Sequence, residues 1–198
     1  VVADDRFPRH EIRVGQERSR VEGTHLWIDR RTGEPADVGG DASGTLGNFM
    51  YPLLSHEFFH LWNVKRLRPA ELWPYDYRAE QDTPLLWWSE GVTDYYADLT
   101  NLRAGLWDQM QFLQSVHSNI EQVESTPEPW SVEDGSEATW IHEVHINSSQ
   151  LYYPKGSLIG LLIDISIRDA TDNAHSLDEV IRALYAKYYR QNKGFTTA

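Results

Sequence analysis

The 198-residue sequence contains no cysteine. This absence excludes disulfide bonds, thiolate metal sites and a cysteine nucleophile together, and it leaves the cellular compartment undecided. Long hydrophobic runs are absent too. The longest apolar run, residues 157–167, is interrupted by Asp164 and is too short to cross a bilayer. We therefore expect this run to form a buried helix and not a membrane span.

Positive charge is scarce in this chain. Lysine and arginine number 18 against 30 aspartates and glutamates, which gives a net charge of -12 at pH 7. This balance argues against a nucleic-acid partner and suits a solvated surface or a basic peptide ligand. Of the eight tryptophans, most suit a core, but three lie among polar residues or prolines and are candidates to line a cleft or an interface: Trp73, Trp130 and Trp140.

The length and the 40% hydrophobic content predict one domain over residues 1–198, with a strand and loop portion over 1–47 and a helical portion over 48–198. Strand-like pieces at 12–14 and 25–28 precede a stretch at 30–47 that is rich in Gly, Asp and Thr and predicts a loop. Helices are expected over 49–67, from Thr83 to about Gly105, from Asp108 onward and from a capping box at Ser176, with a surface excursion over 124–135. The expected fold class is α+β, mostly helical, with a short mixed sheet packed on the helix at 49–67.

The most informative motif is His56-Glu57-Phe58-Phe59-His60. Residues four apart on a helix share one face, so His56 and His60 can direct two imidazoles at one metal ion. Glu57 then lies beside the metal, where its carboxylate can take a proton from water and return it to a leaving amine. The alternative is a pair of histidines that only caps or packs. Apolar residues at helical spacing around the motif favour the metal interpretation.

A catalytic zinc ion usually has three protein ligands, and two glutamates are candidates for the third. Glu80 lies in a polar stretch that predicts a solvated loop. Glu90 lies in a predicted helix with Thr83 as its N-cap and Pro84 at its first position. Asp94 follows one turn later and can accept a hydrogen bond from the far nitrogen of a ligating histidine. We favour Glu90, because metal ligands belong on rigid elements.

A second histidine pair, His142 and His145, is spaced one residue too closely to match the zinc motif. At this spacing the two rings could still meet a metal on a helix. Their apolar neighbours, however, indicate an ordinary amphipathic segment.

Three blocks of the sequence, residues 56–69, 86–99 and 152–156, resemble the glycyl aminopeptidase family of gluzincin zinc metallopeptidases. The resemblance implies a thermolysin-like catalytic domain and one Zn²⁺ held by His56, His60 and Glu90, with Glu57 as general base. It also implies a role for Tyr153, which stands two residues before a Lys-Gly pair. In related enzymes the tyrosine at this place donates its hydroxyl to the oxyanion, and a developing negative oxygen does need such a donor.

The resemblance is weaker near the amino end. The family carries a Gly-x-Glu-His element that contacts the substrate backbone and amino terminus, and the nearest match here is Gly15-Gln16-Glu17-Arg18. Glu17 is therefore a weak candidate to anchor the substrate ammonium, and Glu22 is a second one. Family members commonly have a β-rich domain before the catalytic unit and a PDZ-like module after it, and we expect neither in this chain.

Two functions follow from these patterns. The first is a zinc-dependent aminopeptidase that removes N-terminal residues from peptides by metal-activated water. The second is a protease-derived, inactive subunit that serves as a structural or binding part of a larger assembly, with a partner chain or further domains. The five intact site residues favour the first function, and the altered Gly15-Gln16-Glu17-Arg18 element favours the second.

Overall fold

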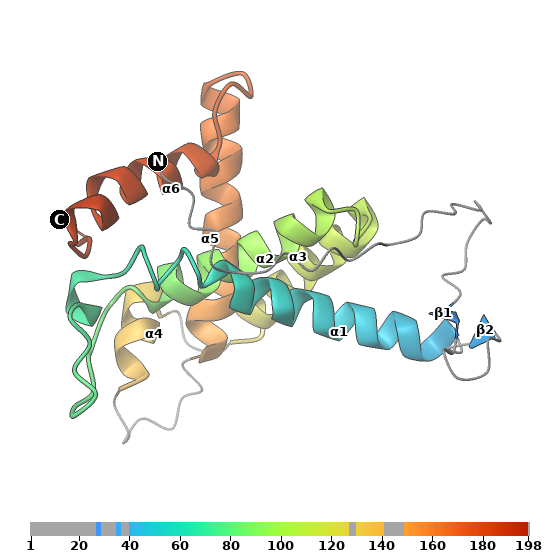
Figure 1. Ribbon diagram of the computed structural model, residues 1–198, viewed down its shortest axis with the longest axis horizontal. Helices are drawn as coiled ribbons and strands as arrows, with labels where there is room; N and C mark the ends of the chain where they lie inside the picture. Colours follow the sequence, from blue (N-terminus) through green and yellow to red (C-terminus); the bar gives the residue numbers. More distant parts are fainter. Residues whose placement is uncertain (1–26, 29–34, 37–39, 127–129, 141–148, 198) are drawn as a thin grey trace, which may run out of the picture. The chain divides into compact units, whose positions relative to one another are not determined.

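A computed structural model of the protein describes residues 27–28, 35–36, 40–126, 130–140 and 149–197 (Figure 1). Contacts divide the chain into two compact units, Val1–Ser43 and Gly44–Ala198. This boundary falls four residues before the predicted change from strand and loop to helix (47 − 43 = 4). The prediction of one domain over the whole chain stays a prediction.

The prediction of a short mixed sheet packed on the metal-binding helix is wrong. Within the described ranges the sheet consists of β1 (Trp27–Ile28) and β2 (Pro35–Ala36), which pair antiparallel. Two dipeptide strands offer too few ladder hydrogen bonds and side chains to form a layer over a helix. Of the predicted strand at 25–28, the described residues 27 and 28 form β1. The mostly helical character of the described part of the chain is confirmed.

The described part of the chain is mainly helical. Its helices are α1 (Gly40–Phe59), the 3₁₀-helix η1 (Ala70–Leu72), the π-helix η2 (Trp87–Gly91), α2 (Val92–Arg103), α3 (Gln109–Glu124), α4 (Val132–Ala138), α5 (Ser149–Ala170), α6 (Leu177–Lys187) and the 3₁₀-helix η3 (Tyr189–Gln191). None of the described helices combines the length and the apolar character that a membrane crossing requires.

Some helix ends lie where local sequence signals predict them, and others do not. Helices α3 and α6 begin where they were predicted. The capping box at Ser176 is confirmed, and the structure shows a second one at Asp108. In contrast, α1 begins at Gly40 inside the predicted loop and ends eight residues before Leu67 (67 − 59 = 8). A third capping box, from Ser131 to Asp134, places α4 in the predicted surface excursion. The prolines and acids around this capping box indicate a surface loop, but the box is sufficient to begin a short helix.

Helix α5 is the centre of the second unit, where it packs against η2, α2, α3, α4 and α6 (Figure 1). Its closest approach is to η2. A Cβ atom on Gly91 would lie 2.5 Å from the backbone oxygen of Tyr152, and one on Gly156 would lie 2.5 Å from the backbone oxygen of Trp87. The two backbones therefore touch through these glycines, which holds the residues of η2 beside the first turns of α5.

The core forms from buried apolar residues of several elements. They are Leu67, Leu85, Trp88, Val92, Tyr95, Tyr96, Leu177 and Phe195. The apolar run at 157–167 does lie in α5, but it is not buried all round, since Leu162 is 61% exposed and Ile165 is 51% exposed. The helix is thus amphipathic, with one face in the core.

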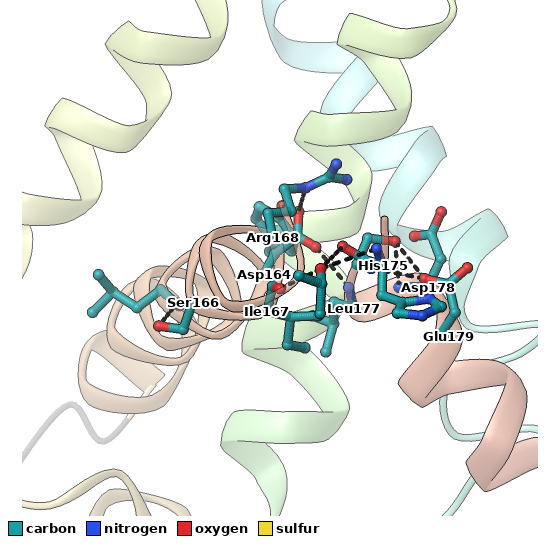
Figure 2. Close-up of polar contacts among 12 residues, drawn as sticks. Asp164, Ser166, Ile167, Arg168, His175, Leu177, Asp178 and Glu179 are labelled. Carbon is teal, nitrogen blue, oxygen red and sulfur yellow. Dashed lines mark hydrogen bonds and ion pairs between the residues drawn. The ribbon is translucent and has the colours of Figure 1, made fainter. Parts of the chain in front are cut away.

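A buried carboxylate joins α5 to its neighbours. Asp164 accepts hydrogen bonds from the Leu177 backbone N–H at 2.6 Å and from Arg168 Nε at 2.9 Å, as Figure 2 shows, and from the Tyr95 hydroxyl at 2.7 Å. Burial alone would raise the pKa of this carboxyl, but these three donors outweigh burial and lower it. Asp164 therefore stays charged and fixes the start of α6 against α5 and α2.

Candidate active site

Of the two histidines of the zinc motif, His56 lies in the last turn of α1 and His60 directly follows the end of that helix. The His60 backbone N–H still bonds the His56 carbonyl at 3.2 Å, so the rings keep helical spacing, with centroids 4.5 Å apart. Each ring uses its Nδ1 atom elsewhere. His56 Nδ1 lies 2.6 Å from Asp94 Oδ1, and His60 Nδ1 lies 3.0 Å from the Asn63 carbonyl oxygen. The Nε2 atoms of both rings are thereby turned to a common point.

Glu90 lies at that point. Its Oε2 atom is 3.2 Å from His56 Nε2 and 3.2 Å from His60 Nε2. One potential ligand atom from each of these three residues lies within 4.8 Å of the other two. Glu90 belongs to the π-helix η2, directly before α2, so its backbone is held on a regular element. The structure brings together the three residues that the sequence singled out.

The other candidate ligand, Glu80, lies apart from this group. It is exposed and lines a separate hollow with Tyr75, Tyr77 and Trp140. Asp94 lies on the far side of His56, at hydrogen-bonding distance from Nδ1. This is the position in which a carboxylate fixes the tautomer of a ligating histidine.

The site strongly favours positive charge. Burial lowers the pKa of the His56 imidazole, but hydrogen bonds to Asp94 and Glu90 outweigh burial and raise that pKa to about 9. Burial raises the pKa of Glu90, but hydrogen bonds from His56 and His60 lower it to about 2. Two carboxylates around a half-enclosed imidazole pair thus stabilise a cation, whether it is a proton on a ring or a metal ion between the rings.

Tyr153, from the first turns of α5, completes the group. Its hydroxyl donates a hydrogen bond to Glu90 Oε2 at 3.0 Å, and its ring stacks on His56 with centroids 6.0 Å apart. Burial and the negative charge of Glu90 raise the pKa of the phenol. The hydroxyl therefore keeps its proton at neutral pH and remains a hydrogen-bond donor.

An open cleft of about 410 Å³ leads to these residues. It is lined by Glu57, His60, Leu61, Val64, Lys65, Tyr75 and Glu90. Glu57 is exposed to this cleft and belongs to the same helical turn as the two histidines. The volume is within the usual range for small-molecule sites, so the cleft can admit a short peptide.

Two residues of the site region were not assigned a role from sequence. Asn63 is fully buried and its amide donates to the Trp88 carbonyl at 2.8 Å and to Thr93 Oγ1 at 3.0 Å. Val64 has a φ of 92°, which is rare for a β-branched residue and costs roughly 1–3 kcal/mol. Asn63 could have been noticed at three residues beyond His60, but nothing in the sequence marks the backbone of Val64.

Four candidate residues lie outside the described residues: Glu17, Glu22, His142 and His145. The three tryptophans considered for a cleft are described and half-buried. Trp73 stacks under the Arg68 guanidinium at 3.7 Å, the Trp130 carbonyl accepts from Lys155 Nζ at 2.5 Å, and Trp140 lines the hollow beside Glu80.

Comparison with known proteins agrees with this geometry. The family model of the M61 glycyl aminopeptidases matches residues 50–159, which is more than half of the chain and includes all the site residues described above. The chain belongs to the M61 glycyl aminopeptidase family. No curated protein matches it.

A solved structure similar to this M61 chain is an aminopeptidase N family protein from Idiomarina loihiensis, with 29% sequence identity and a TM-score of 0.69. The match covers 75% of this chain and 27% of that one, so the chain spans about a quarter of the length of this relative. The M61 membership and this neighbour support a peptidase role.

The M61 site also fits a zinc ion by its own geometry. In a tetrahedral zinc site with bonds of 2.0–2.1 Å, ligand atoms lie roughly 3.3 Å apart. The two Nε2 atoms each lie 3.2 Å from Glu90 Oε2, and both Nδ1 atoms are already engaged. The donor set and these two distances would therefore suit a divalent ion held by His56, His60 and Glu90.

Proposed function

We propose that this chain is a zinc-dependent aminopeptidase, which removes N-terminal residues from peptides. The observation that carries the proposal is the convergence of three ligand atoms, from His56, His60 and Glu90, beside a cleft that also contains Glu57. These three residues would hold the ion. The chemistry that such an ion supplies when bound is Lewis-acid polarisation of a carbonyl and activation of water toward proton loss.

The chain's own residues provide the remaining functions. Glu57 accepts the proton of the attacking water and passes it to the leaving amine, because its carboxylate faces the cleft next to His60. Tyr153 directs its hydroxyl into the same group and donates to the oxygen that becomes negative in the transition state. Asp94 holds His56 in the tautomer that leaves Nε2 free.

The proposal is tested on the purified full chain in two steps. The first is zinc stoichiometry by plasma mass spectrometry, with one zinc per chain expected. The second is hydrolysis of glycyl and alanyl p-nitroanilides by the zinc-loaded chain and by Glu57→Gln. We expect Glu57→Gln to keep its zinc and to lose at least about 10²-fold in kcat.

Two results would count against the proposal. Equal activity of Glu57→Gln would reject Glu57 as the base. Failure to take up zinc, even after incubation with the ion, would favour a protease-derived subunit without catalysis, in which the fold serves to bind a partner.

A further inference from the structure

One cation lines the cleft, and its role is not explained by the hydrolytic machinery. Lys65 is exposed to the cleft that contains Glu57, His60 and Glu90. Among the residues that the structure describes, the Lys65 ammonium has no hydrogen bond and no ion pair. A lysine beside two glutamates in an open cleft is available to a ligand.

The neighbouring cations are already engaged. Arg66 Nη1 donates to the Leu61 carbonyl, and the Arg68 guanidinium stacks on the Trp73 ring at 3.7 Å. Of the three basic residues in the sequence 65–68, Lys65 is therefore the one that lines the cleft without such a partner.

The backbone holds Lys65 in a fixed place relative to the candidate metal ligands. Its N–H donates to the His60 carbonyl at 3.1 Å. On either side, the Val64 N–H donates to the Leu67 carbonyl at 2.7 Å, and the buried Asn63 amide is anchored on η2 and α2. A rare φ at a β-branched residue persists only where its surroundings determine it, so this loop is preorganised.

From this placement we propose that Lys65 is a specificity-determining residue, which binds a carboxylate on the peptide residue that follows the scissile bond. The N-terminal residue of the substrate carries an ammonium group, which Lys65 repels and Glu57 and Glu90 attract. The next residue is the one that can place a negative group by Lys65. The inference rests on the proposed function, because it assumes that a peptide occupies the cleft.

The carboxylate could come from two sources, the terminal carboxylate of a dipeptide or the side chain of Asp or Glu. Both present the same charge and the same acceptor oxygens to an ammonium donor. The net charge of -12 opposes either ligand at long range, but screening confines that repulsion to roughly 8–10 Å in physiological salt. Contact with Lys65 then decides the preference.

The test measures equilibrium binding to the zinc-loaded full chain that carries Glu57→Gln, so that the peptide is not consumed. Isothermal titration compares three ligands: Gly-Ala with a free carboxylate, Gly-Ala amide and Gly-Asp amide. We expect at least one carboxylate ligand to bind about threefold to tenfold more tightly than Gly-Ala amide. Which of the two does so identifies the source of the carboxylate.

Three further variants, made in the same Glu57→Gln chain, complete the test. Lys65→Met should abolish the preference and Lys65→Arg should restore most of it. Lys193→Met removes an equal charge from an exposed position that does not line the cleft, and it should retain the preference. The inference is overturned if the parent shows no preference, if it binds none of the three ligands, or if Lys65→Met keeps the same preference.

Failure of this inference is distinguishable from failure of the proposed function. Hydrolysis of Gly-Ala and Gly-Ala amide by the chain with Glu57 intact, without any carboxylate preference, would reject the role of Lys65 and leave the peptidase in place. A Lys65-dependent preference in a chain that hydrolyses neither peptide would reject the peptidase and leave a peptide-carboxylate binding site.

Discussion

Glu90 and Asp164 are both shielded carboxylates that accept a hydrogen bond from a tyrosine hydroxyl. Glu90 lies in the candidate active site, whereas Asp164 lies at a contact between helices. The other partners of Asp164 are a guanidinium and a backbone N–H, donors that keep their protons at any physiological pH. The other partners of Glu90 are two imidazoles, each with its second nitrogen held elsewhere. Imidazole nitrogens can give up the proton and offer a lone pair instead.

This difference distinguishes a carboxylate with a structural role from one that we propose binds a metal ion. A carboxylate surrounded by permanent donors is saturated, and its charge is used to fix helices. A carboxylate facing two imidazoles accepts hydrogen bonds only while those rings are protonated, and a divalent cation can take the place of the protons. The type of donor, and not burial or the number of hydrogen bonds, distinguishes the two.

The largest expected effect comes from replacing each carboxylate in turn and measuring the zinc affinity of the variant. Glu90→Ala should lower zinc affinity by at least about 10³-fold, since one of three protein ligands is lost. Asp164→Ala and Glu80→Ala should leave it unchanged, because neither residue is near the imidazoles. Competition with a chromogenic chelator measures all three, and a larger loss in Glu80→Ala than in Glu90→Ala would show that the wrong glutamate has been assigned.

The two tyrosines give a matched test. Tyr153→Phe should lower kcat about 10²–10³-fold with little effect on stability, because its hydroxyl is proposed to act on the transition state. Tyr95→Phe removes the corresponding hydroxyl from Asp164 and should lower the free energy of unfolding by about 1–2 kcal/mol while kcat stays the same. Steady-state kinetics and urea unfolding measure both variants. A loss of kcat in Tyr95→Phe, or an unchanged kcat in Tyr153→Phe, would contradict the assignment.

Asp164→Ala should lower the free energy of unfolding by about 2–4 kcal/mol, because a guanidinium, a hydroxyl and a backbone N–H lose their acceptor. The pKa of Asp164 is lowered in the folded chain, so its stabilising effect is present above the unfolded pKa of about 3.9 and is lost as pH falls through the folded pKa. The difference between wild type and variant in urea unfolding should therefore shrink at acid pH. A difference that does not change with pH would exclude a charged Asp164.

The smallest expected effect concerns a third carboxylate, whose burial makes stability depend on pH. Asp98 is buried, and the Ser115 hydroxyl bonds it at 2.5 Å. Burial, with the nearby charge of Asp94, raises its pKa to about 6. A raised carboxyl pKa stabilises the fold most below the unfolded value, about 3.9, and this contribution is lost as pH rises through 6.

Asp98→Asn, which carries no charge, should consequently be more stable than wild type at pH 8, by about 1–2 kcal/mol. The advantage should disappear below pH 4, where both residues are neutral. Thermal unfolding at several pH values between 4 and 8 measures it, and Asp108→Asn on the exposed cap of α3 is a control that should not show this gain on going from pH 4 to pH 8. An equal gain at pH 4 and pH 8 would contradict the titration of Asp98.

Much of the candidate site could be predicted from signals between residues close together in the sequence. The imidazole pair comes from helical spacing, and the preference for Glu90 over Glu80 comes from the cap and helix signals at Thr83 and Pro84. The Thr83 Oγ1 accepts a bond from the Leu85 N–H at 3.3 Å, but the helix that contains Glu90 begins at Trp87 and not at Pro84. The starts of α3 and α6 follow from capping boxes in the same way. These features depend on residues within one or two turns of each other.

The features that could not be predicted depend on contacts between distant segments. Apolar spacing predicts a helix through Leu67, but the buried Asn63 bonds to Trp88 and Thr93 instead, and the chain leaves the helix after Phe59. The mixed sheet was inferred from two short strand-like pieces, and the described residues pair only as dipeptides. Tertiary hydrogen bonds outweighed periodicity in the first case, and strand length limited the second.

The π-helical turn at Trp87–Gly91 sets the angular phase of Glu90 on its helix. A π turn holds one residue more than an α turn, and one α-helical residue corresponds to a rotation of about 100°. Deletion of a single residue there would leave the composition of the motif almost intact while it turned Glu90 away from the two imidazoles. The proposed metal binding would therefore depend on the winding of this helix as well as on the identity of the ligand residues. Two relatives with the same ligand residues would differ in metal affinity if their helices were wound differently.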